Sequence, residues 1–88
     1  MIEKRDFYIN GAWVAPSKPQ DFTVIDPSTE EACATISLGS QADTDAAVAA
    51  ARAAFDDWAI VPKAEKMALL RQLPDVYTAR SDKVAQAI

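Results

Sequence analysis

The sequence contains no histidine, one cysteine and two glycines among its 88 residues. The absence of histidine removes the usual general base, the commonest metal ligand and every Ser-His or Cys-His nucleophile pair. With Cys33 as its single cysteine, the chain cannot form an internal disulfide. The formal net charge is -4. Because a basic patch dominates the affinity of proteins for nucleic acids, this charge argues against nucleic-acid binding.

Long hydrophobic runs are also missing. The longest apolar stretches are rich in alanine and too weakly hydrophobic to span a bilayer. The first residues, "MIEKRDFYING", are charged and lack the apolar region of a signal peptide. The size fits one small domain or part of a larger one. We therefore expect a cytoplasmic protein with no membrane partner.

The first half of the sequence has the pattern of short strands. "FYINGAWV" alternates around Asn10-Gly11, a pair that favours the type I′ turn of a two-residue hairpin. A second turn is expected at Asp26-Pro27-Ser28-Thr29, because proline fixes φ and the aspartate side chain can bond the backbone ahead. The strands predicted around these turns are Phe7–Ile9, Ala12–Val14, Phe22–Ile25 and Ala32–Leu38.

The second half has the pattern of helices. Ser40 and Asp43 have the spacing of a capping box, and a helix is predicted over 42–58 with an acidic first turn. One face of this helix is expected to be apolar, through Val48, Ala51, Phe55 and Trp58.

A further helix opens near Val61-Pro62. Pro74 lies inside its apolar pattern and predicts a kink or a break, because proline removes a helical hydrogen bond. Ser81 is expected to cap a last helical segment over 82–88. The predicted organisation is mainly β over residues 1–39 and mainly α over residues 40–88, with a β hairpin and short strands followed by two to three helices.

Four stretches in order carry a family resemblance. They are "FYINGAWV", "FTVIDPSTEE", "ISLGSQADTDAAVAAARAAFDDW" and "PKAEKMALLRQL". Together they resemble the N-terminal region of the NAD(P)-dependent aldehyde dehydrogenase superfamily, and the resemblance spans residues 7–88. The chain departs from the family pattern at Thr44, Lys66 and Pro74.

The resemblance implies an α/β parent enzyme that oxidises an aldehyde to a carboxylic acid with NAD or NADP, through a cysteine thiohemiacetal. The family's catalytic cysteine, general-base glutamate and dinucleotide-binding segments have no counterpart here. We therefore expect an N-terminal fragment of the cofactor-binding domain, with no catalytic or cofactor-binding residue and no activity alone. Its expected partners are the remainder of the polypeptide and, in the parent enzyme, further copies in a homo-oligomer.

Cys33 and two acidic pairs are candidates for chemistry. A reactive cysteine needs a nearby cation or a helix N-terminus, whereas Cys33 follows Glu30 and Glu31 in a predicted strand. An inert structural cysteine is the favoured interpretation. Acid–base or metal roles are conceivable for Glu30 and Glu31 and for Asp43 and Asp45. Surface positions for the first pair and helix N-terminal charge for the second are favoured.

Backbone oxygens offer one further candidate site. The resemblance implies that the carbonyls of Val24 and Ile25 help to hold a monovalent cation, since hard cations prefer oxygen ligands. Trp13 and Trp58 are interpreted as packing residues rather than ligand-stacking residues.

A different class of function is left open by the residues themselves. The chain can also be a free-standing α+β interaction module without catalysis. Such a module predicts a cooperative monomer with a closed core, whereas a fragment predicts exposed apolar helix faces and association.

Overall fold

The computed structural model describes residues 1–88, with five short strands followed by three helices. The chain divides into two units, Met1–Phe55 and Asp56–Ile88. The predicted hairpin and short strands followed by helices are confirmed. None of the helices is long and apolar enough to cross a membrane.

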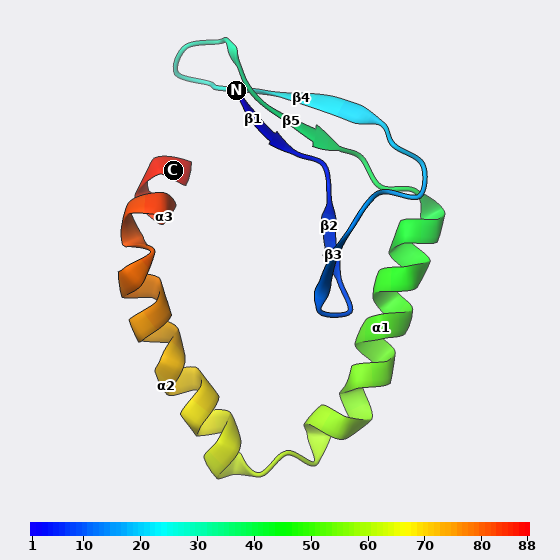
Figure 1. Cartoon of the computed structure of the whole chain (residues 1–88), viewed down its shortest axis with the longest axis vertical. Coiled ribbons are helices and arrows are strands. Elements are labelled where there is room, and N and C mark those ends of the chain that lie inside the picture. The colour runs from blue at the N-terminus through cyan, green and yellow to red at the C-terminus, as the bar shows by residue number, and fades with distance from the viewer. The chain divides into compact units, whose positions relative to one another are not determined.

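A three-stranded sheet lies in the first unit, in the order β1-β5-β4. Its strands are β1 (Ile2–Lys4), β4 (Asp21–Ile25) and β5 (Ala32–Ser37). β5 is the central strand, parallel to β1 and antiparallel to β4 (Figure 1). β1 was not predicted, because its order comes from pairing with β5, which lies far along the chain.

The hairpin pairs β2 (Phe7–Ile9) with β3 (Ala12–Val14). Asn10 and Gly11 have φ values of 54° and 77°, as a type I′ turn requires. The hairpin is a separate two-stranded sheet (Figure 1). Both strands and the turn agree with the sequence-based prediction.

The loop between β4 and β5 closes on Asp26. Its Oδ1 accepts hydrogen bonds from the backbone nitrogen of Ser28 at 2.8 Å and from the Ser28 hydroxyl at 2.6 Å. The Asp26 nitrogen donates to the Glu31 oxygen at 2.8 Å, and Glu30 takes a positive φ of 61°. The predicted Asp-Pro turn therefore forms, with an extra left-handed residue that the pattern did not indicate.

Helix α1 (Gln41–Ala59) begins at the predicted capping box. The Asp43 carboxylate accepts hydrogen bonds from the Ser40 nitrogen and hydroxyl, both at 3.0 Å. The same carboxylate accepts from the backbone nitrogen of Ser17 at 3.0 Å, and the Ser17 and Ser40 hydroxyls are 2.8 Å apart. The loop after the hairpin is thereby bound to the start of α1.

The second unit contains α2 (Lys63–Ala79) and α3 (Ser81–Ala87). Pro62 is the N-cap of α2. A kink or a break was predicted at Pro74, and the helix continues through this residue without a break. Eleven residues of helix precede the proline, and helical bonding on both sides holds the segment together. Ser81 is the first residue of α3 and makes no capping hydrogen bond, so its predicted capping role is wrong.

Apart from Pro16, no apolar side chain of the chain is buried. On α1, Val48 is 63% exposed and Phe55 58% exposed, and on α2 Leu70 is 62% exposed. These exposed side chains belong to the apolar stripes of their helices. Pro16 and Ser37 are the buried residues, so the order of the first unit rests largely on backbone pairing and polar contacts.

Candidate functional site

Cys33 lies in an irregularity of the central strand. Val24 pairs with Ala34, whereas Ile25 pairs with Ala32, so Cys33 is the extra residue of a bulge. Its half-buried Sγ donates to the Val24 carbonyl at 3.4 Å. No histidine, lysine or arginine is bonded to the thiol, and β5 is not a helix N-terminus. The geometry therefore supplies none of the usual means of activating a cysteine.

The acidic residues that were considered for catalysis have separate structural partners. Asp43 is bonded to Ser40 and Ser17, and its pKa is lowered, first by the backbone hydrogen bond from Ser40. Asp45 accepts a bond from the side-chain amide of Gln41 at 2.9 Å. Glu30 and Glu31 are exposed residues of the turn. The chain contains no group of three or more His, Cys, Asp or Glu residues that could hold a metal ion.

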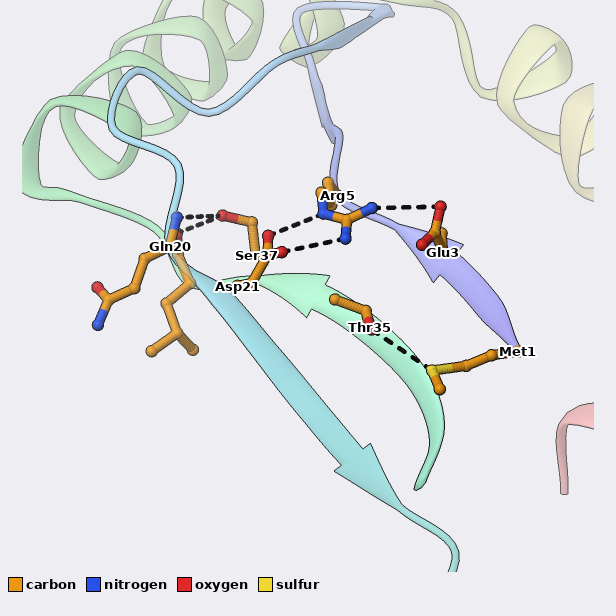
Figure 2. Close-up of polar contacts among 8 residues, drawn as sticks. Met1, Glu3, Arg5, Gln20, Asp21, Thr35 and Ser37 are labelled. Atoms are coloured by element: carbon orange, nitrogen blue, oxygen red, sulfur yellow. Dashed lines mark hydrogen bonds and ion pairs between the residues drawn. The ribbon is translucent and has the colours of Figure 1, made fainter. Parts of the chain in front are cut away.

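The strongest electrostatic feature lies at the end of the three-stranded sheet. Arg5 donates from Nε to Asp21 at 2.8 Å and from a terminal nitrogen to the same carboxylate at 3.0 Å. Its other terminal nitrogen is 3.4 Å from Glu3. Figure 2 shows the guanidinium between the two carboxylates. The bond from Arg5 lowers the pKa of Asp21, and the same bond raises the pKa of Arg5.

This arrangement connects the two outer strands. Arg5 follows β1 and Asp21 begins β4, and between them Ser37 ends β5. The Ser37 hydroxyl accepts from the Gln20 nitrogen at 3.1 Å and donates to the Leu38 oxygen at 3.0 Å (Figure 2). The Arg5–Asp21 pair is sixteen residues apart in sequence and has no local signal, so sequence analysis missed it.

Three open pockets lie in the first unit, and two of them are larger than the third, which has about 310 Å³. One, of about 390 Å³, is lined by Glu3, Lys4, Arg5, Asp6 and Trp13. Its charges balance and its arginine is already bonded, so it has no excess charge to attract an ion. The other, of about 520 Å³, lies between the hairpin and the alanines of α1 and presents mainly apolar surface. Neither holds a nucleophile beside a base.

The two tryptophans lie on the surface. Trp13 is 68% exposed and meets Tyr8 edge to face, with ring centroids 5.1 Å apart. Trp58 is 50% exposed, and the ammonium of Lys66 lies 5.1 Å from its ring centroid. Each indole therefore makes one local contact, and neither lies in a closed core.

Comparison with known proteins identifies the relatives of this arrangement. The sequence model of the aldehyde dehydrogenase family matches residues 13–88. The chain is 41% identical, over all 88 residues, to a 3-succinoylsemialdehyde-pyridine dehydrogenase from a Pseudomonas species, of which it covers 18%. It is also similar to the crystal structure of an aldehyde dehydrogenase from Bartonella henselae, with a TM-score of 0.93 and 49% identity.

That structural match covers very different fractions of the two chains. It covers 98% of this chain and 18% of the Bartonella protein. The chain thus spans less than a fifth of the length of both relatives. Nearly every residue of this chain takes part in the match. The chain belongs to the aldehyde dehydrogenase family and corresponds to its N-terminal region.

Proposed function

We propose that this chain is the N-terminal scaffold of an NAD(P)-dependent aldehyde dehydrogenase whose catalytic residues lie outside residues 1–88. The main support is the structural match, which covers 98% of the chain but 18% of a dehydrogenase. The candidate nucleophile, Cys33, occupies a bulge and bonds a backbone carbonyl. The role left to these residues is to shape and support, not to react.

The exposed apolar stripes support the same proposal. Burial of apolar surface is the main favourable term in folding, yet Pro16 is the one apolar side chain of this chain that is buried. Phe55 on α1 and Leu70 on α2 each leave more than half of their side chains in contact with solvent. The proposed scaffold becomes stable when the remainder of the polypeptide covers these stripes. In the whole enzyme, further copies of the polypeptide complete a homo-oligomer.

The proposed enzyme oxidises an aldehyde to a carboxylic acid, with NAD or NADP as the hydride acceptor. The residues of this chain do not fit a dinucleotide. Phosphate cradles need closely spaced glycines before a helix, whereas Gly11 is in the hairpin turn and Gly39 stands alone before α1. We therefore assign no cofactor contact and no step of the reaction to residues 1–88.

A second part of the proposal is a monovalent-cation site that this chain shares with the remainder of the polypeptide. Its ligands are the backbone oxygens of Val24 and Ile25. Val24 is paired with Ala34 in the sheet, and its backbone oxygen also accepts from the weak thiol donor of Cys33 at 3.4 Å. The nearest carboxylate in sequence, Asp26, is already bonded to Ser28. The chain fits part of a site, because hard cations need more oxygen ligands than these two carbonyls provide.

The experiment for the proposed function is an assay of the purified 88-residue chain for aldehyde-dependent formation of NADH or NADPH. Intact mass of the assayed fractions excludes longer contaminants. We expect no turnover with any aldehyde. Turnover that copurifies with the 88-residue species would show that this chain contains an active site, and the scaffold proposal would be wrong.

A further inference from the structure

We propose that Asn10 is a site of spontaneous modification, at which the side-chain amide is lost and aspartate and isoaspartate form. Asn10 is the only asparagine of the chain and is followed by Gly11. Both residues are exposed at the tip of the hairpin. No heavy atom lies within 4 Å of the position that a Cβ on Gly11 would occupy. This inference does not depend on the proposed function.

The reaction needs only water. The backbone nitrogen of Gly11 attacks Cγ of Asn10, the new C–N bond closes a five-membered imide, and the side-chain amide leaves as ammonia. Water then opens the imide at either carbonyl, which gives aspartate or isoaspartate and restores a free Gly11 N–H. The attacking and attacked groups belong to adjacent residues, so the step is intramolecular and needs no bound partner. Glycine at the next position leaves the attacking nitrogen unshielded.

The native turn controls how often the reaction can occur. At φ of 54° and 77°, the two turn residues are held in left-handed conformations and are not free to rotate toward ring closure. The hairpin, however, is a two-stranded sheet that pairs with no third strand. Isolated two-stranded hairpins are only marginally stable in water, and such segments open locally more often than the strands of a larger sheet. Each opening gives Asn10 the freedom to react.

The two products affect the hairpin differently. Aspartate tolerates the left-handed conformation and leaves the backbone length unchanged. Isoaspartate carries the chain through its side-chain carbon and adds a methylene to the main chain. A two-residue turn cannot absorb the additional atom without a change in register. The pairing of Tyr8 with Trp13, which brings their rings within 5.1 Å, is then lost.

The test is incubation of the purified chain at mildly alkaline pH, followed by ion-exchange chromatography and fragment-mass analysis of the tryptic peptide 6–52, since trypsin does not cleave between Lys18 and Pro19. We expect a species with one additional negative charge, and the amide-to-acid mass change at Asn10 only. Enzymatic methylation of isoaspartate should label the same peptide. In Asn10→Gln the acidic species should form at least about tenfold more slowly, since the longer side chain must close a larger ring. Asn10→Asp marks where the aspartate product elutes.

A parallel incubation in denaturant separates the chemistry from the control by the turn. We expect the unfolded chain to react faster than the native chain, with the native chain still forming the acidic species. Formation in denaturant but none in the native chain would overturn the proposal, because the turn would then protect Asn10 completely. Equal rates in the native chain and in Asn10→Gln would also overturn it.

Discussion

At the scale of single residues, polar side chains provide most of the specific long-range contacts in the first unit. Arg5 and Asp21 make two hydrogen bonds across the end of the sheet, and Ser17 connects the loop after the hairpin to Asp43. All of these side chains are exposed or half-buried. Surface ion pairs contribute little individually and are weakened by salt, so these contacts select an arrangement and do not supply the main stability.

The first prediction concerns Asp21→Asn, which keeps the shape of the side chain and removes its charge. We expect faster amide hydrogen exchange in β1, because Arg5 loses the carboxylate that connects it to β4. High salt should speed exchange in the unsubstituted chain and have less effect in the variant. Exchange in α3, in the other unit, is the internal control and should not change. Equal β1 exchange in both proteins would contradict a connecting role for this pair.

The pH dependence of the same contact has a definite sign. The bond from Arg5 lowers the pKa of Asp21 below the value near 3.9 of an unfolded aspartate. A lowered pKa gives a stabilisation that is present above the unfolded value and is lost as pH falls through the folded value. Protection of β1 should therefore decline in acid and remain level near neutral pH. In Asp21→Asn, the part of this decline that comes from protonation of Asp21 should be absent.

At the scale of elements, the helices begin in different ways. α1 has a side-chain cap, in which Ser40 and Asp43 satisfy backbone groups reciprocally. α2 begins after Pro62, and α3 begins at Ser81 without a capping bond. The difference gives a matched pair of serines, one that caps a helix and one that does not.

Ser40→Ala should therefore destabilise the first unit, by about 1 kcal/mol, the usual cost of removing a helix N-cap. The substitution also removes the hydroxyl contact with Ser17. Urea denaturation followed by circular dichroism measures the change. Ser81→Ala is the control, and its effect should be close to zero. Equal effects of the two substitutions would mean that the Ser40 hydroxyl does not act as a cap.

Pro74→Ala tests the helix that continues through a proline. Pro74 has no N–H to donate to the carbonyl of Leu70, one turn earlier. A proline in a helix interior costs about 3 kcal/mol relative to alanine, so the variant should have higher helix content and a higher melting temperature. Pro62→Ala is the control, because Pro62 precedes the helix and costs it no internal bond. A less helical Pro74→Ala would show that the proline is favourable in its position.

Local signals predicted the elements better than their connections. The Asn-Gly turn, the Asp-Pro turn and the Ser40–Asp43 cap depend on residues close in sequence, and all three form. β1 was missed because its order comes from pairing with β5, thirty-two residues later in the chain. The contacts of Arg5 with Asp21 and of Ser17 with Asp43 were missed for the same reason.

The candidate site was predictable mainly through what the residues lack. Without histidine or a cation beside Cys33, the sequence already favoured an inert thiol. The bulge that places Sγ against the Val24 carbonyl depends on strand register and has no local signature. The cation ligands at Val24 and Ile25 stay a prediction.

At the scale of the whole molecule, the unburied apolar side chains determine the expected behaviour. Large exposed apolar patches mark surfaces that bind other protein or aggregate. We predict that the purified chain associates as its concentration rises, measured by size-exclusion chromatography with light scattering. Val48→Glu and Leu70→Glu, on two exposed stripes, should reduce association, whereas Ala53→Glu, at an exposed position of α1 off its apolar stripe, is a control for added charge. A cooperative monomer at all concentrations would instead favour the free-standing interaction module.

The most direct test of the scaffold role is a chimera. Residues 1–88 replace the matching segment of the Bartonella relative, to which they are 49% identical, and aldehyde-dependent formation of NADH or NADPH is measured. We predict an active chimera, and equal activity when Cys33 is changed to serine, because these residues support a site located elsewhere. Loss of activity in the folded chimera, or its dependence on the Cys33 thiol, would contradict the account.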